Sequence, residues 1–425
     1  MSPADLSIHF FAQMALILVT ARVVGWLAHK YLMQPQVVGE MIAGVILGPS
    51  LFGLVAPDLQ AMIFPKDSQS VLYVLSQFAV GLYMFLVGLE FRTDHFRAQF
   101  KSAAAVSLAG MLAPFLLAVP LTPFLMKVPG LFAPQITTNE ATLFMGAAIA
   151  LTAFPMLARI IKERGIAGTS LGTLSLSAGA FGDAVAWGVL AVVLASFGAG
   201  AKVAYLAIGG GLAFAIFMVT IGRRMVAPLE TMTQKAGEVT PTILAIAMIA
   251  FMLSAFAMDG AGIHAVFGGF LLGCVMPRGR FSESVQKQLE PFTVAILLPV
   301  FFTYSGLHTR LDLVSDPKLL LIAVLILLVS VVAKFGACWL AARLTGQDNP
   351  TALGIGALMN ARGLMELIII NIGLQKGIIG ETLFSMLVLM AIATTVMASP
   401  LFEWVYGRKM RRNEQADSEL PVFPN

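Results

Sequence analysis

The chain has 425 residues, of which 58% are hydrophobic and 12% are charged, and its mean hydropathy is +0.87. Soluble domains carry about 25% charged residues, so this composition excludes a soluble enzyme and predicts a polytopic membrane protein. The formal net charge of +4 comes from basic residues scattered between apolar segments, which indicates topology signals rather than a nucleic-acid surface.

Apolar runs long enough to cross a bilayer, which takes about 20 residues, recur thirteen times along the chain. A membrane barrel would show short alternating strands, whereas these runs are continuous and rich in Leu, Ala and Met. We therefore expect an all-α fold of thirteen transmembrane helices. They cover residues 6–28, 35–54, 71–90, 101–126, 141–161, 169–197, 203–222, 240–257, 261–276, 291–308, 319–342, 351–374 and 380–405.

Lysines and arginines are distributed unevenly between the two sides of these helices. Eighteen of the 27 fall in the connections after odd-numbered helices, at the helix ends that border these connections or in the C-terminal tail, six fall on the opposite side, and three lie deeper inside the helices. By the positive-inside rule we expect the C-terminus in the cytoplasm and the N-terminus outside. Residues 1–405 then form one transmembrane domain, and residues 406–425 a short cytoplasmic tail.

Two short patterns recur in the same order in the two halves of the chain. Ala43-Gly44 with Leu47-Gly48 returns as Gly268-Gly269 with Leu272-Gly273. A second pattern, which begins at Gly88-Leu89, returns at Gly306-Leu307 with a similar offset along the chain. The common order and the similar offsets predict repeats over 6–197 and 240–405, inverted relative to each other and joined by a linker helix at 203–222. Such repeats are typical of secondary transporters, although small-residue packing motifs in any helix bundle are an alternative explanation.

The repeats predict that the fifth and twelfth helices correspond, and each has an interruption in its middle. The fifth contains Leu151-Thr152-Ala153-Phe154-Pro155, where the proline removes a main-chain donor. The twelfth contains Met359-Asn360-Ala361-Arg362-Gly363, a polar stretch with a glycine. We expect both to be unwound at membrane depth, where free carbonyls and half-helix ends can coordinate a cation. An ordinary kinked helix is the alternative for Pro155.

Ionisable residues inside membrane helices are costly, about 2.5–3.5 kcal/mol each on insertion scales, so each requires a reason. Asp183, in the middle of the sixth helix, is expected to bind a proton and a metal cation alternately, or else to cap a break or pair with a remote cation. Lys334 is expected either to take part in exchange or to stabilise the crossing helices. Arg362 and Glu366 lie four residues apart on one helical face and are interpreted as a supporting ion pair. The absence of a nucleotide-binding loop, zinc motif or nucleophile elbow indicates transport driven by an ion gradient, with no enzyme activity and no cofactor.

Four stretches of the sequence together resemble those of one transporter family. They are Gln36-Val37-Val38-Gly39-Glu40, Thr152-Ala153-Phe154-Pro155-Met156-Leu157-Ala158-Arg159, Asp183-Ala184-Val185-Ala186-Trp187 and Asn360-Ala361-Arg362-Gly363-Leu364-Met365-Glu366-Leu367. They are similar to the monovalent cation:proton antiporter superfamily, in the branch of Kef-type potassium efflux systems and plant cation/proton exchangers. The resemblance covers essentially the whole membrane region.

The resemblance implies thirteen helices, two crossed broken helices, a dimerisation domain and a core that moves in an elevator-like fashion. It also implies that Asp183 is the ion-carrying aspartate and Lys334 the buried lysine of the second repeat. The sequence departs from the family at Gly182, where Asn or Asp is usual. A single carboxylate favours one proton for one cation, unless Lys334 carries a second proton.

These observations predict a homodimeric Na⁺/H⁺ or K⁺/H⁺ antiporter in a bacterial-type plasma membrane. Asp183 and Thr152 are expected to bind the transported cation and Asp183 the proton, at a break formed with Pro155 and Gly363. Supporting or charge-balancing roles are expected for Lys334, Asn360, Arg362 and Glu366. A separate regulatory subunit is a possible partner, and nucleic acid is not expected. The alternatives are a sodium-coupled organic solute symporter of the same fold, a cation channel and a non-transporting membrane sensor.

Overall fold

The computed structural model describes residues 2–32, 34–90, 96–166, 169–194, 200–260, 265–309, 314 and 316–418. These residues are almost entirely helical, and Phe132 and Ile379 form an isolated β-bridge. The chain divides into two compact units that each combine an early and a late part of the sequence. The first contains Met1–Thr93 and Trp187–Leu313, and the second contains Asp94–Ala186 and Val314–Asn425.

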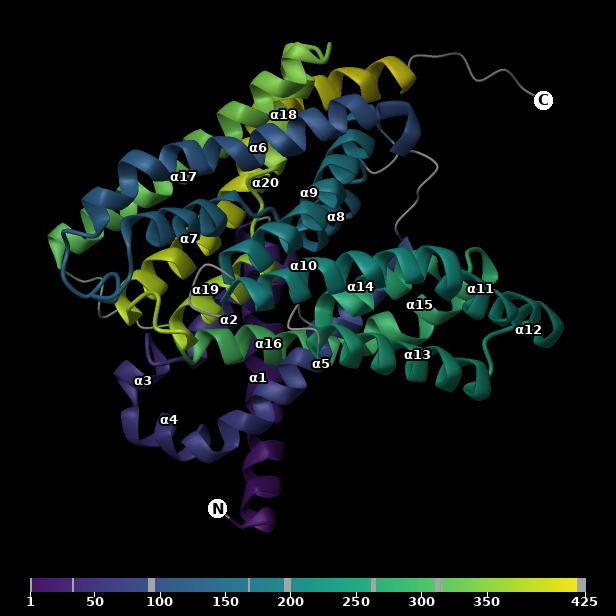
Figure 1. Cartoon of the computed structure of the whole chain (residues 1–425), viewed down its shortest axis with the longest axis horizontal. Coiled ribbons are helices and arrows are strands. Elements are labelled where there is room, and N and C mark those ends of the chain that lie inside the picture. The colour runs from purple at the N-terminus through teal and green to yellow at the C-terminus, as the bar shows by residue number, and fades with distance from the viewer. Residues whose placement is uncertain are drawn as a thin grey trace. The chain divides into compact units, whose positions relative to one another are not determined.

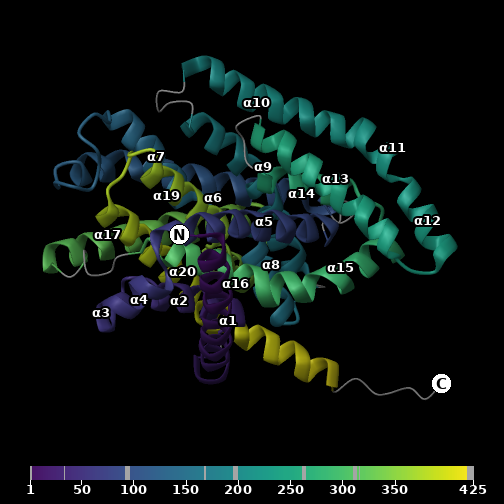
Figure 2. The same ribbon diagram turned by 90° about the horizontal axis from the view of Figure 1, so that it is seen from below.

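The first unit consists of helices from both halves of the chain (Figure 1). Its N-terminal helices are α1 (Pro3–Leu32), α2 (Gln36–Leu47), α3 (Phe52–Val55), α4 (Pro57–Ile63) and α5 (Lys66–Glu90). Its later elements are α10 (Gly200–Phe217), the π-helical turn η2 (Met218–Gly222), α11 (Arg223–Val226), α12 (Pro228–Ala236), α13 (Pro241–Gly260), α14 (Ala265–Val275), α15 (Arg280–Phe292), the π-helical turn η3 (Thr293–Leu297) and α16 (Leu298–Gly306). Figure 2 shows α10, α11 and α12 following one another as one long curved run.

Small residues set the closest helix contacts in the first unit. A methyl group added to Gly44 of α2 would overlap the carbonyl of Phe302 in α16, and one on Gly306 would overlap the carbonyl of Gly44. A methyl group on Gly273 of α14 would likewise overlap the carbonyl of Phe85 in α5. Glycine is needed at these positions because only a residue without a side chain lets two membrane helices approach this closely. The first recurrent pattern lies in α2 and returns in α14, and the second lies in α5 and returns in α16. Because α2 packs against α16 and α5 against α14, each copy of one pattern contacts a copy of the other.

The second unit contains α6 (Phe96–Leu125), α7 (Thr138–Ala150), α8 (Phe154–Glu163), the beginning of α9 (Ser170–Leu194), α17 (Pro317–Leu344), α18 (Asn349–Leu358), α19 (Leu364–Gln375) and α20 (Glu381–Ser418). Helices α6 and α17 lie side by side (Figure 1), and Cys338 of α17 approaches Gly110 of α6.

The start of α17 is stabilised by a capping side chain. Asp316 accepts hydrogen bonds from the Lys318 and Leu319 amides, at 2.7 and 3.4 Å, and Pro317 is the first residue of the helix.

Among the described residues, nine helices are long and apolar enough to cross a membrane, and they coincide with nine of the thirteen expected segments. The other four expected segments correspond to α7 with α8, to α9, to α14 and to α18 with α19. With a helical rise of about 1.5 Å for each residue, each half of a broken helix is too short to cross a bilayer by itself. The count of thirteen therefore stays a prediction, whereas the polytopic all-α architecture is confirmed.

Two segments differ in detail from the sequence-based expectation. Helix α20 does not end near residue 405 but continues to Ser418, because the polar stretch that follows is rich in good helix formers such as Arg, Glu and Gln. The helix expected at 291–308 begins earlier, at Arg280, and passes through the turn η3 directly after Pro291. Proline lacks the amide that an α-helical hydrogen bond requires, and π-helical turns commonly accommodate such defects.

Candidate functional site

Both helices that the sequence marks as interrupted are broken in the second unit. Helix α7 ends at Ala150, α8 begins at Phe154, and the three residues between them are not helical. Helix α18 ends at Leu358 and α19 begins at Leu364. Pro155 is the second residue of α8, a position where a missing amide costs nothing because the first amides of a helix have no helical partner.

The two breaks contact each other. The Ala153 amide donates a hydrogen bond of 3.3 Å to the Ala361 carbonyl, and the Thr152 hydroxyl donates one of 3.4 Å to the Met359 carbonyl. Glycine at position 363 allows a close approach, because a methyl group there would lie 2.7 Å from the Met156 Cγ atom and the Met156 side chain or one of the segments would have to shift. The unwound segments 151–153 and 359–363 therefore cross in direct contact.

Four half-helix ends meet at this crossing. Helices α7 and α18 end there with carbonyls beyond the regular helical ladder, which carry partial negative charge, and α8 and α19 begin there with amides that have no partner in the preceding turn, which carry partial positive charge. Such an arrangement provides ligands for a cation and for a carboxylate at the same point in the membrane. The crossing is therefore the candidate site.

Buried basic side chains occupy the negative end of α7. Lys334 of α17 is 1% exposed and its ammonium group donates to the Ala150 carbonyl. Arg362 is completely buried and donates to the Ala148 carbonyl at 3.4 Å and to the hydroxyl of Ser330. Both cations therefore sit where the half-helix carbonyls concentrate negative charge.

Arg362 also pairs with Glu366, as the spacing of four residues predicts. Its Nη1 atom lies 3.2 Å from the Oε1 atom of Glu366, and both side chains are at most 1% exposed. A buried ion pair is weak evidence for stability, because desolvation offsets much of the attraction between the charges. The Oε2 atom of Glu366 is buried and accepts no hydrogen bond within the described part of the chain. The pair therefore leaves one carboxylate oxygen available to a proton or an ion.

Asn360 presents a second available oxygen. Its Nδ2 atom donates a hydrogen bond of 2.9 Å to the Gly356 carbonyl, which fixes the orientation of the amide. Its Oδ1 atom is buried and accepts no hydrogen bond from any residue that the structure describes. A buried acceptor without a partner costs about 1–3 kcal/mol, so a cation or a water molecule is the expected partner.

Asp183 lies on α9 of the second unit, and the structure describes its backbone but not its side chain. The preceding residue indicates what lies beside this turn of α9: a methyl group on Gly182 would be 2.9 Å from the hydroxyl of Ser107 in α6. The side chain of Pro155 also falls outside the described part of the structure. Of the residues chosen from the sequence, the structure brings together Thr152, Lys334, Asn360, Arg362, Gly363 and Glu366.

Sequence reasoning missed two hydroxyl groups that contact this site. The hydroxyl of Ser330 in α17 accepts a hydrogen bond from the Arg362 guanidinium. The hydroxyl of Thr395 in α20 accepts one from the Arg362 amide and lies within hydrogen-bond distance of the Arg362 carbonyl. Both residues are completely buried. Their only sequence signal is a hydroxyl in the middle of an apolar helix, which is also found where Ser or Thr merely bonds its own helix.

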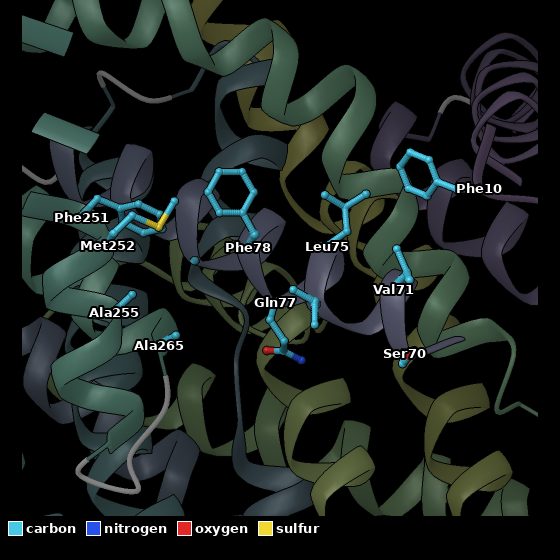
Figure 3. Close-up of a pocket in the computed structure, with 12 residues that line it drawn as sticks. Phe10, Ser70, Val71, Leu75, Gln77, Phe78, Phe251, Met252, Ala255 and Ala265 are labelled. Atoms are coloured by element: carbon cyan, nitrogen blue, oxygen red, sulfur yellow. The ribbon is translucent and has the colours of Figure 1, made fainter. Parts of the chain in front are cut away.

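An apolar cavity of about 800 Å³ lies in the first unit, between α1, α5, α13 and α14. Figure 3 shows Phe78, Leu75, Phe251 and Met252 around it, with Gln77 among its few polar residues. Among the described residues that line it, none is ionisable. The crossing of the broken helices, with its buried charged side chains, is therefore the better candidate for an ion site.

Comparison with known proteins agrees with this geometry. The family described as sodium/hydrogen exchanger, transmembrane, matches residues 18–406. The chain is 38% identical over 403 residues to the Na⁺/H⁺ antiporter NhaS4 of Synechocystis sp., covering 93% of this chain and 96% of that protein. It is 32% identical over 401 residues to the cation/H⁺ antiporter 17 of Arabidopsis thaliana, covering 93% of this chain and 48% of that protein, so it spans about half the length of this plant relative.

A solved structure with the same fold is that of the sodium proton antiporter MjNhaP1 from Methanocaldococcus jannaschii at pH 8. The TM-score is 0.68 at 16% sequence identity, covering 96% of this chain and 99% of that one, which shows a shared fold. The predicted sodium/proton antiporter-like fold is thereby confirmed, whereas the inverted repeat stays a prediction. The extent of the family match, together with the identity to its relatives, shows that the chain belongs to the sodium/hydrogen exchanger family of membrane proteins.

Proposed function

We propose that this protein is a secondary active transporter that exchanges Na⁺ or K⁺ for protons at one site, alternately exposed to the two sides of the membrane. The observation that carries the proposal is the direct crossing of two unwound membrane segments beside buried ionisable groups. Membership of the sodium/hydrogen exchanger family supports the same conclusion, and the names of the relatives NhaS4 and cation/H⁺ antiporter 17 describe this chemistry.

In this proposal Asp183 binds the cation when ionised and releases it when protonated. Thr152 assists with its hydroxyl oxygen: its proton is directed to the Met359 carbonyl, which leaves the oxygen lone pairs available to a cation. The Oδ1 atom of Asn360 is a further oxygen at the crossing. A proton and a cation compete for this one carboxylate. The site therefore carries the cation in one direction and the proton in the other, and the ion gradient supplies the energy.

Lys334 and Arg362 balance charge in this proposal rather than carry protons. The Lys334 ammonium group donates to the Ala150 carbonyl at the negative end of α7, where a positive charge is favoured. With Asp183 as the proton carrier, one proton is exchanged for one cation. We therefore propose electroneutral exchange.

The alternatives receive less support. The comparisons give no support to a sodium-coupled symporter of organic solutes, since both relatives described above are named antiporters. A channel requires a continuous conducting path, whereas the crossing described above is packed with buried side chains. Transport by exchange remains the function that explains the buried charges.

We also propose a homodimer in a plasma membrane of bacterial type, with the N-terminus outside and the C-terminus in the cytoplasm. The resemblance of the four motifs supports the dimer, and the distribution of Lys and Arg supports the orientation. A separate regulatory subunit is compatible with this arrangement.

Proton flux in proteoliposomes tests the proposal. We expect Na⁺ or K⁺, added outside vesicles with an internal pH dye, to drive proton movement at a rate unchanged when the membrane potential is held near zero. Valinomycin with equal K⁺ on both sides holds it there when Na⁺ is added, and a lipophilic ion does so when K⁺ is added. A rate that depends on the clamp would contradict electroneutral exchange and would make Lys334 a second proton carrier. The absence of any cation-triggered proton movement, with protein-free vesicles as the baseline, would contradict antiport itself.

A further inference from the structure

Thr395 of α20 holds the second broken helix at its break. Its hydroxyl oxygen accepts a hydrogen bond of 3.0 Å from the Arg362 amide. The same hydroxyl lies 2.9 Å from the Arg362 carbonyl and 2.7 Å from the Ala391 carbonyl, and these two oxygens compete for its one proton. A single side chain of α20 therefore contacts both main-chain groups of one residue in the unwound segment.

This contact replaces bonds that the break removes. Main-chain groups at helix ends have no helical partner, and buried ones must find another. Because Thr395 is completely buried, no water replaces it at low cost. It fixes the main chain of Arg362, and from there the guanidinium reaches the Ala148 carbonyl and Glu366.

The neighbouring residue shows what an ordinary buried threonine does in the same helix. Thr394 is also completely buried, and its hydroxyl donates at 2.8 Å to the Met390 carbonyl and lies 3.1 Å from the Ala391 carbonyl. Both acceptors belong to its own helix, a common arrangement with no effect on other elements. The two adjacent threonines therefore differ in one respect, the bond to the unwound segment.

Further along α20, side chains on the same helical face contact the residue that follows α8, the second half of the first broken helix. Ser399, four residues after Thr395 and one helical turn away, accepts a hydrogen bond of 3.0 Å from the Nε atom of Arg164. Glu403, another turn on, lies 2.8 Å from the Nη1 atom of Arg164. Arg164 directly follows α8, the second half of the first broken helix. Helix α20 thus contacts both broken helices through polar side chains at intervals of four residues.

We propose that Thr395 is a positioning residue for ion exchange, which fixes the unwound segment 359–363 in the geometry that the transported cation requires. The proposal rests on the function proposed above, because it assigns to Thr395 the placement of that same site. Thr395 does not touch the ion: it acts through the main chain of Arg362 and through the adjacent Asn360. Loss of the hydroxyl should therefore weaken cation binding at the crossing more than it slows the loaded transporter.

The experiment compares Thr395→Val, which keeps the shape and removes the hydroxyl, with Thr395→Ser and with Thr394→Val as the matched control. Exchange driven by NaCl and by KCl is measured in proteoliposomes at neutral and at mildly alkaline pH. Because two buried main-chain groups lose a partner, we expect Thr395→Val to raise the apparent KM for the cation roughly tenfold. Thr395→Ser and Thr394→Val should keep the wild-type KM and pH profile. An unchanged KM in Thr395→Val, or an equal rise in Thr394→Val, would overturn the proposal.

Hydrogen–deuterium exchange provides a readout that does not depend on transport. In Thr395→Val the peptide containing the Arg362 amide should exchange faster than in wild type, whereas in Thr394→Val it should not. If the wild-type protein moves no protons, the proposed function fails, and this measurement still decides whether Thr395 fixes the main chain of the unwound segment. If Thr395→Val cannot be recovered folded, Thr395→Cys takes its place, with an intermediate rise in KM and in amide exchange expected and unchanged values contradicting the proposal.

Discussion

Among individual residues, the site depends on where a few polar atoms lie in an apolar surrounding. Lys334, Arg362 and Glu366 are buried within the second unit, and their charges are balanced by each other and by the ends of α7 and α19. The charges of these three side chains sum to one positive charge, from two cations and one carboxylate. An ionised Asp183 would neutralise the set, and a protonated Asp183 would leave it positive. An ionised Asp183 in the same unit would therefore lower the electrostatic cost of burying this net positive charge.

Replacing Asp183 by Asn should abolish cation-triggered proton movement, down to the level of protein-free vesicles. An amide neither accepts a proton in the physiological range nor attracts a cation with a full charge. The variant is compared with Asp259→Asn, which alters an exposed carboxylate near the end of α13 and should keep the wild-type rate. Exchange at a wild-type pH dependence in a folded Asp183→Asn protein would refute the assignment of the carrier.

Among the helices, the two interruptions have different local causes and one shared result. Pro155 cannot continue a helix and so starts α8 instead, whereas segment 359–363 contains no proline and is held open by contacts with other helices. The sequence indicated both breaks, because proline and a polar run with glycine are visible in an apolar helix. It did not indicate how the second break is held, because Thr395 belongs to another helix, α20, and no local pattern links the two.

Substituting Gly363 by Ala should damage the crossing. The new methyl group would lie 2.7 Å from the Met156 Cγ atom and 3.3 Å from the Ala153 Cβ atom, so the Met156 side chain must change its position or the two segments must separate. Overpacking of this kind costs about 1–3 kcal/mol, and we expect a lower melting temperature together with a strongly reduced exchange rate.

The control for this substitution is Gly336→Ala in α17, where an added methyl group meets no described atom within 4 Å. Alanine favours a helix over glycine by about 1 kcal/mol, so this variant should be at least as stable as wild type and should keep its exchange rate. Equal rates for the two alanine variants would show that the crossing tolerates separation, and would contradict the role given to Gly363.

In the molecule as a whole, each compact unit is assembled from both halves of the chain. The glycine contacts pair α2 with α16 and α5 with α14 in the first unit, and these pairs contain the patterns that recur in the sequence. The exchange of partners between halves supports the proposed inverted repeat. The ionisable residues chosen for the site all belong to the second unit, whereas the apolar cavity belongs to the first.

Orientation in the membrane is a prediction for the whole chain. Because 18 basic residues lie on one side and six on the other, we expect an epitope tag fused after Asn425 to be accessible to protease only from the cytoplasmic side. A tag placed before Met1 should be accessible only from outside, and it serves as the matched control. Accessibility of both tags from the same side would require an even number of spans and would contradict the predicted topology.

Composition and short motifs were enough to establish the class of the protein, the approximate ends of most helices, the positions of both breaks and the family. These properties are local and can be read along the chain, and the family assignment is confirmed. The roles of the site residues stay predictions until transport is measured. The folded chain was needed to find that Lys334 bonds the Ala150 carbonyl, that Arg362 reaches Ser330 and that Thr395 holds the break. Those contacts join residues that are distant in the sequence, so they depend on how the helices cross and not on any local pattern.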